Sequence, residues 1–363
     1  MKVGVVLGAG GIIGGAWLAG ALKALEAATR WDPGSADRLV GTSAGSVMAA
    51  LLAGGAPPWR EGTDTAAGEP EDLAAAGSPF GDEATEERMA AAEAGEGDPG
   101  GMGLRLHTER PRLGPASPKL ALSALRQRDH HSPAAFVAGL LPEGVFSLDE
   151  LQSLIRGVVP SGWADHPGLW IVACAYSTGE RTVFGRPDAP AADLDDAVAA
   201  SCAIPAFYRA IRIGGHRYVD GGLWSPSNLD VLEGEGLDLV ICLNPTSSLA
   251  PSGSRVSDRV AGLWRSASGR ALGSEAKRLR AAGTEVVLVQ PTAEDLEVMP
   301  ANLMSRRRRR EVYETARRTV GEQLRSGANR EAVEALWRRG FRAAAAPGAP
   351  SFGLDGLRGD ACA

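Results

Sequence analysis

The sequence predicts an α/β protein of three layers, in which a mostly parallel central sheet lies between helices. Short apolar runs typical of buried strands alternate along the chain with longer stretches of helical spacing, and this alternation favours parallel strands joined by crossover helices. Two of the runs, at residues 237–243 and 285–290, are apolar almost throughout, as expected for strands buried on both faces. The first run, Val3 to Leu7, enters a glycine-rich turn that opens a helix.

The chain is expected to form one domain over residues 1–340, interrupted by a variable and partly disordered excursion at 55–145. From Gly54 to about Gly114 the composition is rich in Ala, Gly, Pro and Glu, with few large apolar side chains to form a core. Order is expected to resume by Ser147, where the capping-box spacing of Ser147 and Glu150 predicts a helix through Val158. The residues 341–363, rich in Ala, Gly and Pro, are predicted to be a disordered tail.

The remaining elements follow from the same patterns. Strands are expected at 39–40, 169–176, 181–184 and 209–213, and helices at 44–53, 194–202, 256–282 and 305–339.

Composition narrows the class of protein. The formal charge of −6, from 44 acidic and 38 basic residues, argues against nucleic acid as the main partner. The 4 cysteines lie far apart without zinc-site spacing, which indicates a reducing, cytoplasmic compartment. Glycines interrupt the apolar N-terminal stretch, which argues against a secretory signal, and no window is long and apolar enough to span a bilayer. We therefore expect membrane contact to be peripheral at most, and the sequence indicates no obligate protein partner.

A candidate nucleophile lies in Gly41-Thr42-Ser43-Ala44-Gly45, the one G-x-S-x-G of the chain. A serine raised on a tight turn between strand and helix passes close to its neighbours' backbone, so that glycines at 41 and 45 are needed. Its hydroxyl would then lie at a helix N-terminus, which favours developing negative charge. The alternative is that Ser43 merely caps the helix.

The glycine-rich turn from Gly8 to Gly15 also has two interpretations. Consecutive backbone N–H groups in such a turn can form an oxyanion hole for acyl transfer, with Gly10 and Gly11 as the first candidates. The dinucleotide fingerprint G-x-G-x-x-G is missed by one residue, because Ile13 occupies the position of its third glycine. A tight turn without chemical function is the remaining alternative.

The proton acceptor for Ser43 is predicted to be Asp220, in Tyr218-Val-Asp-Gly-Gly222. The aspartate ends a short strand and the two glycines let the chain turn away beneath it, which suits a direct Ser–Asp dyad. An aspartate is a weak base, so Asp220 would need contact with the hydroxyl and protection from water. An ordinary Asp-Gly-Gly turn is one alternative. A triad is another, using His216 with Asp195 or Asp196.

These three motifs, in this order, resemble the patatin-like phospholipase family. The small-residue segment Ala199–Pro205 before the aspartate strand is similar to that family as well. The resemblance covers roughly residues 1–55 and 145–335. It implies a Ser–Asp dyad that hydrolyses acyl esters of phospholipids or neutral lipids without metal or cofactor, on a three-layer α/β/α fold. The residues that it assigns are the nucleophile Ser43, the base Asp220, the oxyanion donors Gly10, Gly11 and Ile12, and the nucleophile-elbow glycines Gly41 and Gly45.

One departure from the family concerns the glycine loop, where many members carry a basic residue and this chain has Ile12 and Ile13. Preference for phospholipid over other esters is therefore left open. A lipid-binding or regulatory protein of the same fold without turnover is the alternative function, and a nucleotide-binding protein ranks third.

Two further segments have open interpretations. The five bases Arg306 to Arg310 form either a solvated helix start or a surface attracted to anionic lipid head groups. The apolar segment Phe136 to Leu141 is predicted either to cover an acyl pocket or to join the core.

Overall fold

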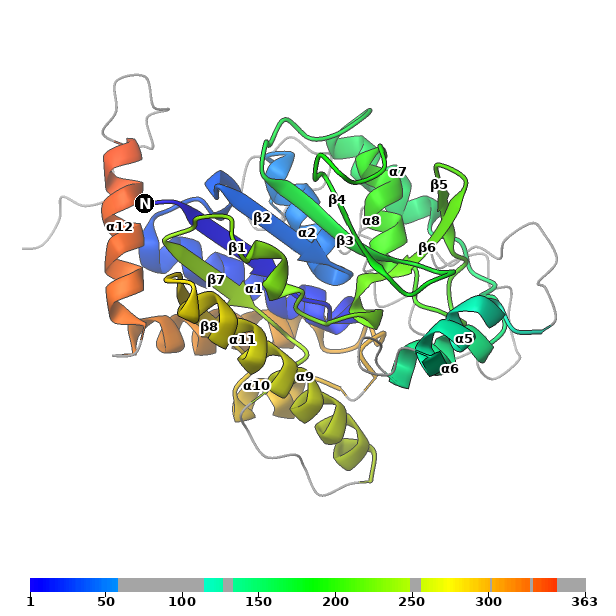
Figure 1. Ribbon diagram of the computed structural model, residues 1–363. Helices are drawn as coiled ribbons and strands as arrows, with labels where there is room; N and C mark the ends of the chain where they lie inside the picture. The colour runs from blue at the N-terminus through cyan, green and yellow to red at the C-terminus, as the bar shows by residue number, and fades with distance from the viewer. Residues whose placement is uncertain (58–113, 127–132, 249–255, 301, 327–328, 345–363) are drawn as a thin grey trace, which may run out of the picture.

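The chain folds around one twisted sheet with helices on both sides (Figure 1). The structure, a computed structural model, describes residues 1–57, 114–126, 133–248, 256–300, 302–326 and 329–344. The predicted excursion lies outside the described residues over 58–113 and 127–132, and the predicted tail over 345–363. The predicted fold class, a three-layer α/β/α protein with a mostly parallel sheet, is confirmed.

Eight strands form the sheet in the order β5-β6-β3-β2-β1-β7-β8, with β4 paired to β3. The five strands from β3 to β8 in this order are parallel, whereas β4, β5 and β6 are joined to the sheet by antiparallel pairs. The strand bounds are β1 Val3–Leu7, β2 Arg38–Thr42, β3 Leu169–Ala175, β4 Arg181–Phe184, β5 Ile211–Ile213, β6 His216–Asp220, β7 Leu239–Leu243 and β8 Glu285–Val289.

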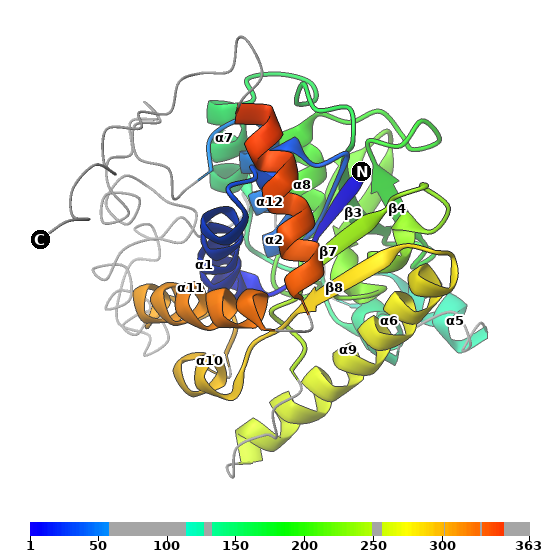
Figure 2. The ribbon, with the colours of Figure 1, turned by 90° about the vertical axis from the view of Figure 1, so that its left-hand side faces the viewer.

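Successive residues of a strand point to opposite faces of the sheet, and helices bury both of these faces. Val5 packs in a large cluster with the helices of one face, whereas its neighbour Val6 packs in a second cluster with α9. Figure 2 shows this division, with α1 and α11 on one side of the sheet and α9 on the other. The helices of the first face are α1 Gly11–Thr29, α2 Ala44–Ala53, α7 Asp149–Val158, α8 Leu194–Cys202, α11 Arg309–Arg325 and α12 Arg330–Ala344; α9 spans Val256–Ala281.

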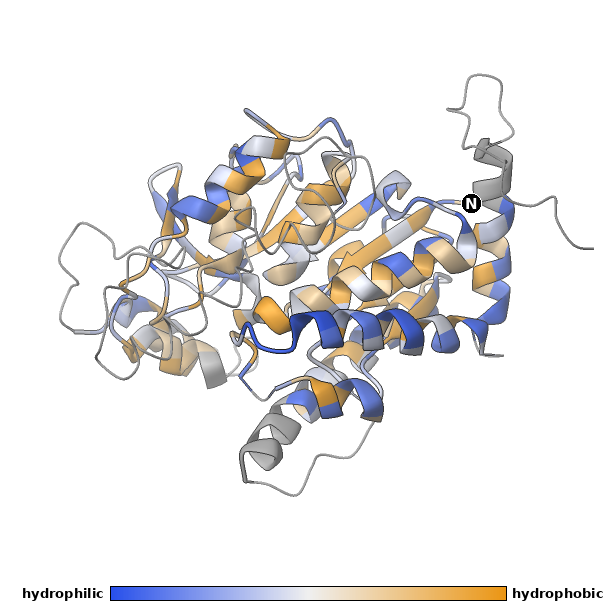
Figure 3. Ribbon diagram, turned by 180° about the vertical axis from the view of Figure 1, so that it is seen from behind, coloured by the Kyte–Doolittle hydropathy of each residue, from blue (hydrophilic) through white to orange (hydrophobic). Residues whose placement is uncertain are grey.

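The helices are apolar where they meet the sheet and hydrophilic outside (Figure 3). The turn of α1 that carries Trp17, Leu18 and Leu22 is fully buried, because α11 packs along its outer side. Gly20 lets the two helices approach closely, since a side chain there would collide with the backbone of α11 at Tyr313.

The strand β3 has an unusual set of neighbours. Residues 171–174 pair with β4, and this stretch overlaps the residues that pair with β2 and with β6. Because a strand has only two edges, β4 occupies one edge and β2 and β6 share the other. The two strands therefore meet end to end along β3, with Thr42 opposite Val172 and Asp220 opposite the next residue, Ala173.

Several predicted boundaries are wrong for local reasons. Helix α1 begins at Gly11, so the glycine turn is shorter than expected and Ile12 lies in the first helical turn. The predicted capping box at Ser147 does not form, because Leu148 is the N-cap residue and no side chain caps α7. A capping box does form between Thr292 and Asp295, and it starts a short helix that we did not predict, α10 Ala293–Val298.

The single helix expected over 305–339 is two helices, α11 and α12. The first begins only at Arg309, after Arg308 adopts a left-handed backbone conformation. The sequence between them includes Gly327, a common helix terminator.

Order resumes earlier than Ser147. Helices α5 Pro118–Arg126 and α6 Pro133–Leu140 form a hairpin beside β6 (Figure 1). Their small residues Ala124, Ala135 and Ala138 are buried against the sheet, in a cluster that includes Tyr176 and Val219. In the predicted apolar segment 136–141, Ala138 joins this cluster, whereas the large side chains of Phe136, Val137, Leu140 and Leu141 are exposed.

Candidate active site

Ser43 lies on a sharp turn between β2 and α2. Its backbone has φ 53° and ψ −123°, a region that residues other than glycine rarely adopt. Ser43 occupies the N-cap position of α2, but its side chain makes no capping hydrogen bond to the helix. The serine is buried, with 5% of its surface exposed.

The glycines on both sides of Ser43 are sterically required. A Cβ at Gly41 would lie 2.5 Å from the carbonyl oxygen of Gly45, and a Cβ at Gly45 would overlap the carbonyl oxygen of Leu7. Both obstacles are backbone atoms, which cannot rotate away. The backbone therefore passes the turn as closely as we predicted from the G-x-S-x-G spacing, and neither Gly41 nor Gly45 has room for a side chain.

We expect the substitution Gly45→Ala to destabilise the protein by more than about 4 kcal/mol, because the end of β1 would have to move. Denaturant unfolding of the variant checks this. Gly273→Ala is the matched control: Gly273 lies inside α9 with no atom within 4 Å of its added Cβ, so that this alanine should stabilise by about 1 kcal/mol. Equal effects of the two substitutions would contradict the steric account.

Asp220 lies close enough to the Ser43 side chain for the two groups to interact. One carboxylate oxygen accepts the backbone N–H of Gly222 at 2.7 Å, and the backbone N–H of Asp220 donates to Ala203 at 3.0 Å. The aspartate is 7% exposed. Burial raises its pKa from 3.8 to about 6, against the opposing effects of the Gly222 N–H and the Ser43 side chain.

The two side chains meet because of the shared edge of β3. Ser43 follows Thr42, the last residue of β2, and Asp220 is the last residue of β6. Since these two strand ends face neighbouring residues of β3, the hydroxyl and the carboxylate emerge side by side. Gly221 completes the junction, because a Cβ there would touch the Thr42 side chain at 3.2 Å.

Ser201, which we did not predict as a site residue, holds the turn in place. Its hydroxyl accepts the backbone N–H of Ser43 at 2.9 Å and donates to the carbonyl of Val172 at 2.6 Å. It is fully buried in α8, within the small-residue segment Ala199–Pro205. A lone hydroxyl in a helix of alanines was the sequence signal for a buried polar contact.

The glycine loop lies against both parts of the site. A Cβ at Gly45 would lie 2.9 Å from the Gly8 carbonyl oxygen, and a Cβ at Gly222 would lie 3.5 Å from Ala9. The backbone N–H groups of Gly10, Gly11 and Ile12 donate no hydrogen bond to another described residue. Gly11 has φ +59°, and the first amides of a helix have no partner within it.

The alternative triad is not formed. His216 begins β6 and is exposed, four residues from Asp220 at the other end of the strand, which is about 13 Å along it. The carboxylates considered with it lie on α8, where Asp195 pairs with Arg156 and Asp196 accepts from Gln152.

The arginine run is not one helical surface. Arg308 pairs with Glu311 at 2.6 Å and also donates to the carbonyl of Glu297, and the side chain of Arg309 donates to the carbonyl of Arg306. These contacts lie at the N-terminus of α11, which begins at Arg309. Attraction to anionic lipid stays a prediction, which binding to anionic vesicles would test.

A cleft of about 440 Å³ lies at the opposite end of the strands from Ser43, where β1, β2 and β7 begin. Its charged groups serve the fold: Asp37 accepts the backbone N–H of Val3, and Arg38 pairs with Glu235 at 2.9 Å. We therefore propose no catalytic or binding site in this cleft.

The fold and the serine turn define an α/β protein with a buried serine at a strand–helix junction. The chain belongs to the patatin-like phospholipase family, whose family model matches residues 5–233, more than half of the chain. No curated protein matches the chain. Among solved structures, the crystal structure of VipD from Legionella pneumophila is similar, with a TM-score of 0.38 and 16% sequence identity. The alignment covers 89% of this chain and 66% of that chain.

No helix of the described residues is long and apolar enough to cross a membrane.

Proposed function

We propose that the protein is a carboxylic ester hydrolase that cleaves acyl esters of lipids by a Ser43–Asp220 dyad. The observation that carries the proposal is the proximity of these two buried side chains, within the segment that the family match includes. The pKa of Asp220, raised to about 6, supports a role as base, because proton transfer is most efficient when the pKa of the base lies near the working pH.

The reaction has two steps. Ser43 Oγ attacks the ester carbonyl carbon while Asp220 takes the hydroxyl proton, and the resulting oxyanion receives hydrogen bonds from the backbone of Gly10, Gly11 and Ile12. The alcohol leaves with that proton and an acyl-serine remains. Water then attacks the acyl carbon and gives a proton to Asp220. As the bond between Ser43 Oγ and the acyl carbon breaks, Asp220 returns that proton to Oγ, and the fatty acid leaves.

The choice among lipid esters is not fixed by these groups. The glycine loop offers backbone amides, and at positions 12 and 13 it has isoleucines in place of a cation that could pair with a phosphate. We therefore propose a lipid acyl ester as the substrate class without a preference for phospholipid.

Labelling with a fluorophosphonate probe tests the proposal. The expected result is a single covalent adduct on the peptide that contains Ser43, together with release of fatty acid from lipid vesicles. An enzyme that releases fatty acid with the adduct on another residue would overturn the dyad. A protein that binds lipid vesicles but neither reacts with the probe nor releases fatty acid would instead be the silent lipid-binding alternative.

The pH dependence of hydrolysis is a separate prediction. Asp220 accepts a proton only in its ionised form, so kcat/KM should be half-maximal near pH 6 and fall about tenfold per pH unit below it. Initial rates between pH 4 and 9 with a soluble ester measure this profile. A midpoint near pH 4 would show that Asp220 is not the group that must lose its proton.

A further inference from the structure

The loop from Ser225 to Leu229 touches all three parts of the proposed site. The carbonyl of Pro226 accepts the backbone N–H of Ala9, in the glycine loop, at 2.8 Å. The side-chain amide of Asn228 donates to the Thr42 hydroxyl at 3.1 Å and to the Gly221 carbonyl at 3.3 Å. Thr42 precedes the nucleophile and Gly221 follows the base, so one side chain joins the two strand ends.

Asn228 is built into this position. It is fully buried, and its backbone has φ 51° and ψ 30°, a left-handed conformation that asparagine tolerates better than most residues. Its amide also donates to the Ser225 carbonyl at 2.6 Å, and its Oδ1 accepts from Arg181 at 3.3 Å. Because the guanidinium can only donate, this contact fixes Oδ1 toward Arg181 and the NH₂ group toward Thr42 and Gly221.

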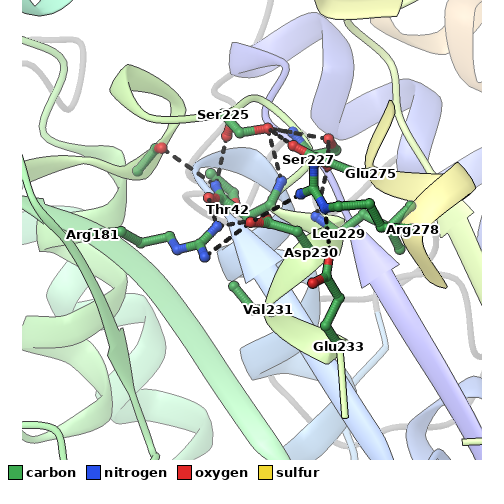
Figure 4. A network of polar contacts seen from close by, with 12 residues as sticks. Thr42, Arg181, Ser225, Ser227, Leu229, Asp230, Val231, Glu233, Glu275 and Arg278 are labelled. Carbon is green, nitrogen blue, oxygen red and sulfur yellow. Dashed lines mark hydrogen bonds and ion pairs between the residues drawn. The ribbon is translucent and has the colours of Figure 1, made fainter. Parts of the chain in front are cut away.

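Arg181 is itself held in a fixed orientation. Its guanidinium makes two contacts with the Asp230 carboxylate, at 2.6 and 3.1 Å (Figure 4). This parallel arrangement is the strong form of an arginine–carboxylate pair. Asn228 is therefore held by a fixed partner on the side away from the proposed site as well.

A buried carboxylate on α9 anchors the same loop. Glu275 accepts the hydroxyls of Ser225 at 2.7 Å and Ser227 at 2.6 Å, and the backbone N–H of Leu229 at 3.0 Å (Figure 4). Burial raises the pKa of Glu275, and the bonds from the two serines oppose that rise. A carboxyl group is costly to bury unless it is hydrogen-bonded, and these bonds tie the loop to a helix that the family match does not include.

We propose that Asn228 is a positioning residue, which holds Thr42 and Gly221 at a fixed separation and so keeps the Ser43 hydroxyl aligned with Asp220. Glu275 acts behind it by fixing the loop. The kinetic consequence rests on the proposed function, because a displacement of about 1 Å between reacting groups can slow a reaction by about 100-fold. The structural part, that Asn228 holds the two strand ends together, does not depend on activity.

The substitution Asn228→Gly tests this, because glycine keeps the left-handed backbone and removes the side chain with its amide. We expect the rate constant of fluorophosphonate labelling and kcat to fall by about 10- to 100-fold, with KM unchanged and labelling still complete. Thr42→Val removes the partner hydroxyl without changing side-chain shape. The effects of the two substitutions should be less than additive when combined, because both break the same bond.

Glu233→Gln is the matched control. Glu233 pairs with Arg278 at the exposed side of the same network, and the variant should label within twofold of the wild-type rate. A purely structural role of Asn228 would lower the stability or the labelled fraction while the labelling rate constant stayed at the wild-type value. That result would overturn the proposal.

Hydrogen exchange separates the positioning role from the proposed function. In Asn228→Gly, the peptides covering residues 40–46 and 218–224 should both exchange faster, and neither should change in Glu233→Gln. Failure of the wild-type protein to label would count against the proposed function alone, and the exchange data would still decide the positioning role. Unchanged exchange in both peptides would refute it.

Discussion

Ser43→Ala is expected to reduce hydrolysis of a lipid ester by a factor of about 10⁴ or more, because it removes the atom that forms the acyl intermediate. Binding of lipid should persist, since the variant loses one buried oxygen and leaves the turn intact. The measurement is kcat from fatty-acid release, with unfolding by denaturant to show that the protein remains folded.

The control for this variant is Ser153→Ala. Ser153 is exposed on α7 and donates only to the carbonyl of Asp149, so its loss should leave kcat unchanged. Hydrolysis by Ser43→Ala at more than a tenth of the wild-type rate would assign the nucleophile to another residue.

Asp220→Asn is expected to lower kcat/KM by about 10²- to 10⁴-fold and to stabilise the protein at the same time. The loss of activity follows from replacing a base by an amide of the same shape. The gain in stability follows from burial, because the wild-type carboxylate must be ionised in a site where ionisation is unfavourable.

The sign of the stability change depends on pH. The folded-state pKa of Asp220, about 6, lies above its ordinary value of 3.8. Protonated Asp220 therefore contributes stability that is fully present below pH 3.8 and is lost as the pH rises to about 6. Relative to wild type, the free energy of unfolding of Asp220→Asn should rise by up to about 3 kcal/mol between pH 4 and pH 7.

Denaturant unfolding at both pH values measures this difference, and Asp149→Asn is the control because Asp149 is exposed. A difference between Asp220→Asn and wild type that does not change with pH would mean that Asp220 titrates normally in the folded protein.

The sequence predicted much of the fold because its strongest patterns are local. The apolar run Val3 to Leu7 and the small-residue helix Ala44 to Ala53 were predicted with the bounds that the structure has. The strand Arg181–Phe184 and the helix Leu194–Cys202 were predicted with equal accuracy. In each case, spacing of apolar residues and flanking glycines or acids determine the element within a few residues.

The prediction failed where a local pattern had competing solutions. Ser147 had the spacing of a capping box, yet the helix starts after Leu148, while Thr292 forms such a box that we overlooked. The α5–α6 hairpin was missed because its buried side chains are mostly alanines, which pack well only against a surface such as that around Tyr176. The composition of the α5–α6 segment alone does not show that such a surface exists elsewhere in the chain.

In the candidate site, the sequence indicated Ser43 and Asp220 through their glycine neighbours, but not the groups that support them. Asn228 lies in a loop without a recognisable motif, and Glu275 lies in a helix whose exposed residues are also charged. Their roles depend on contacts between distant segments, and a pattern along one chain carries no record of such contacts.

The end-to-end meeting of β2 and β6 on one edge of β3 has a consequence for how this chain can change. The spacing of the nucleophile and the base is a matter of backbone pairing register, which the connecting segments do not set. An insertion or deletion between α2 and β3 should therefore leave the spacing of Ser43 and Asp220 unchanged, because both residues are held by their pairing with β3.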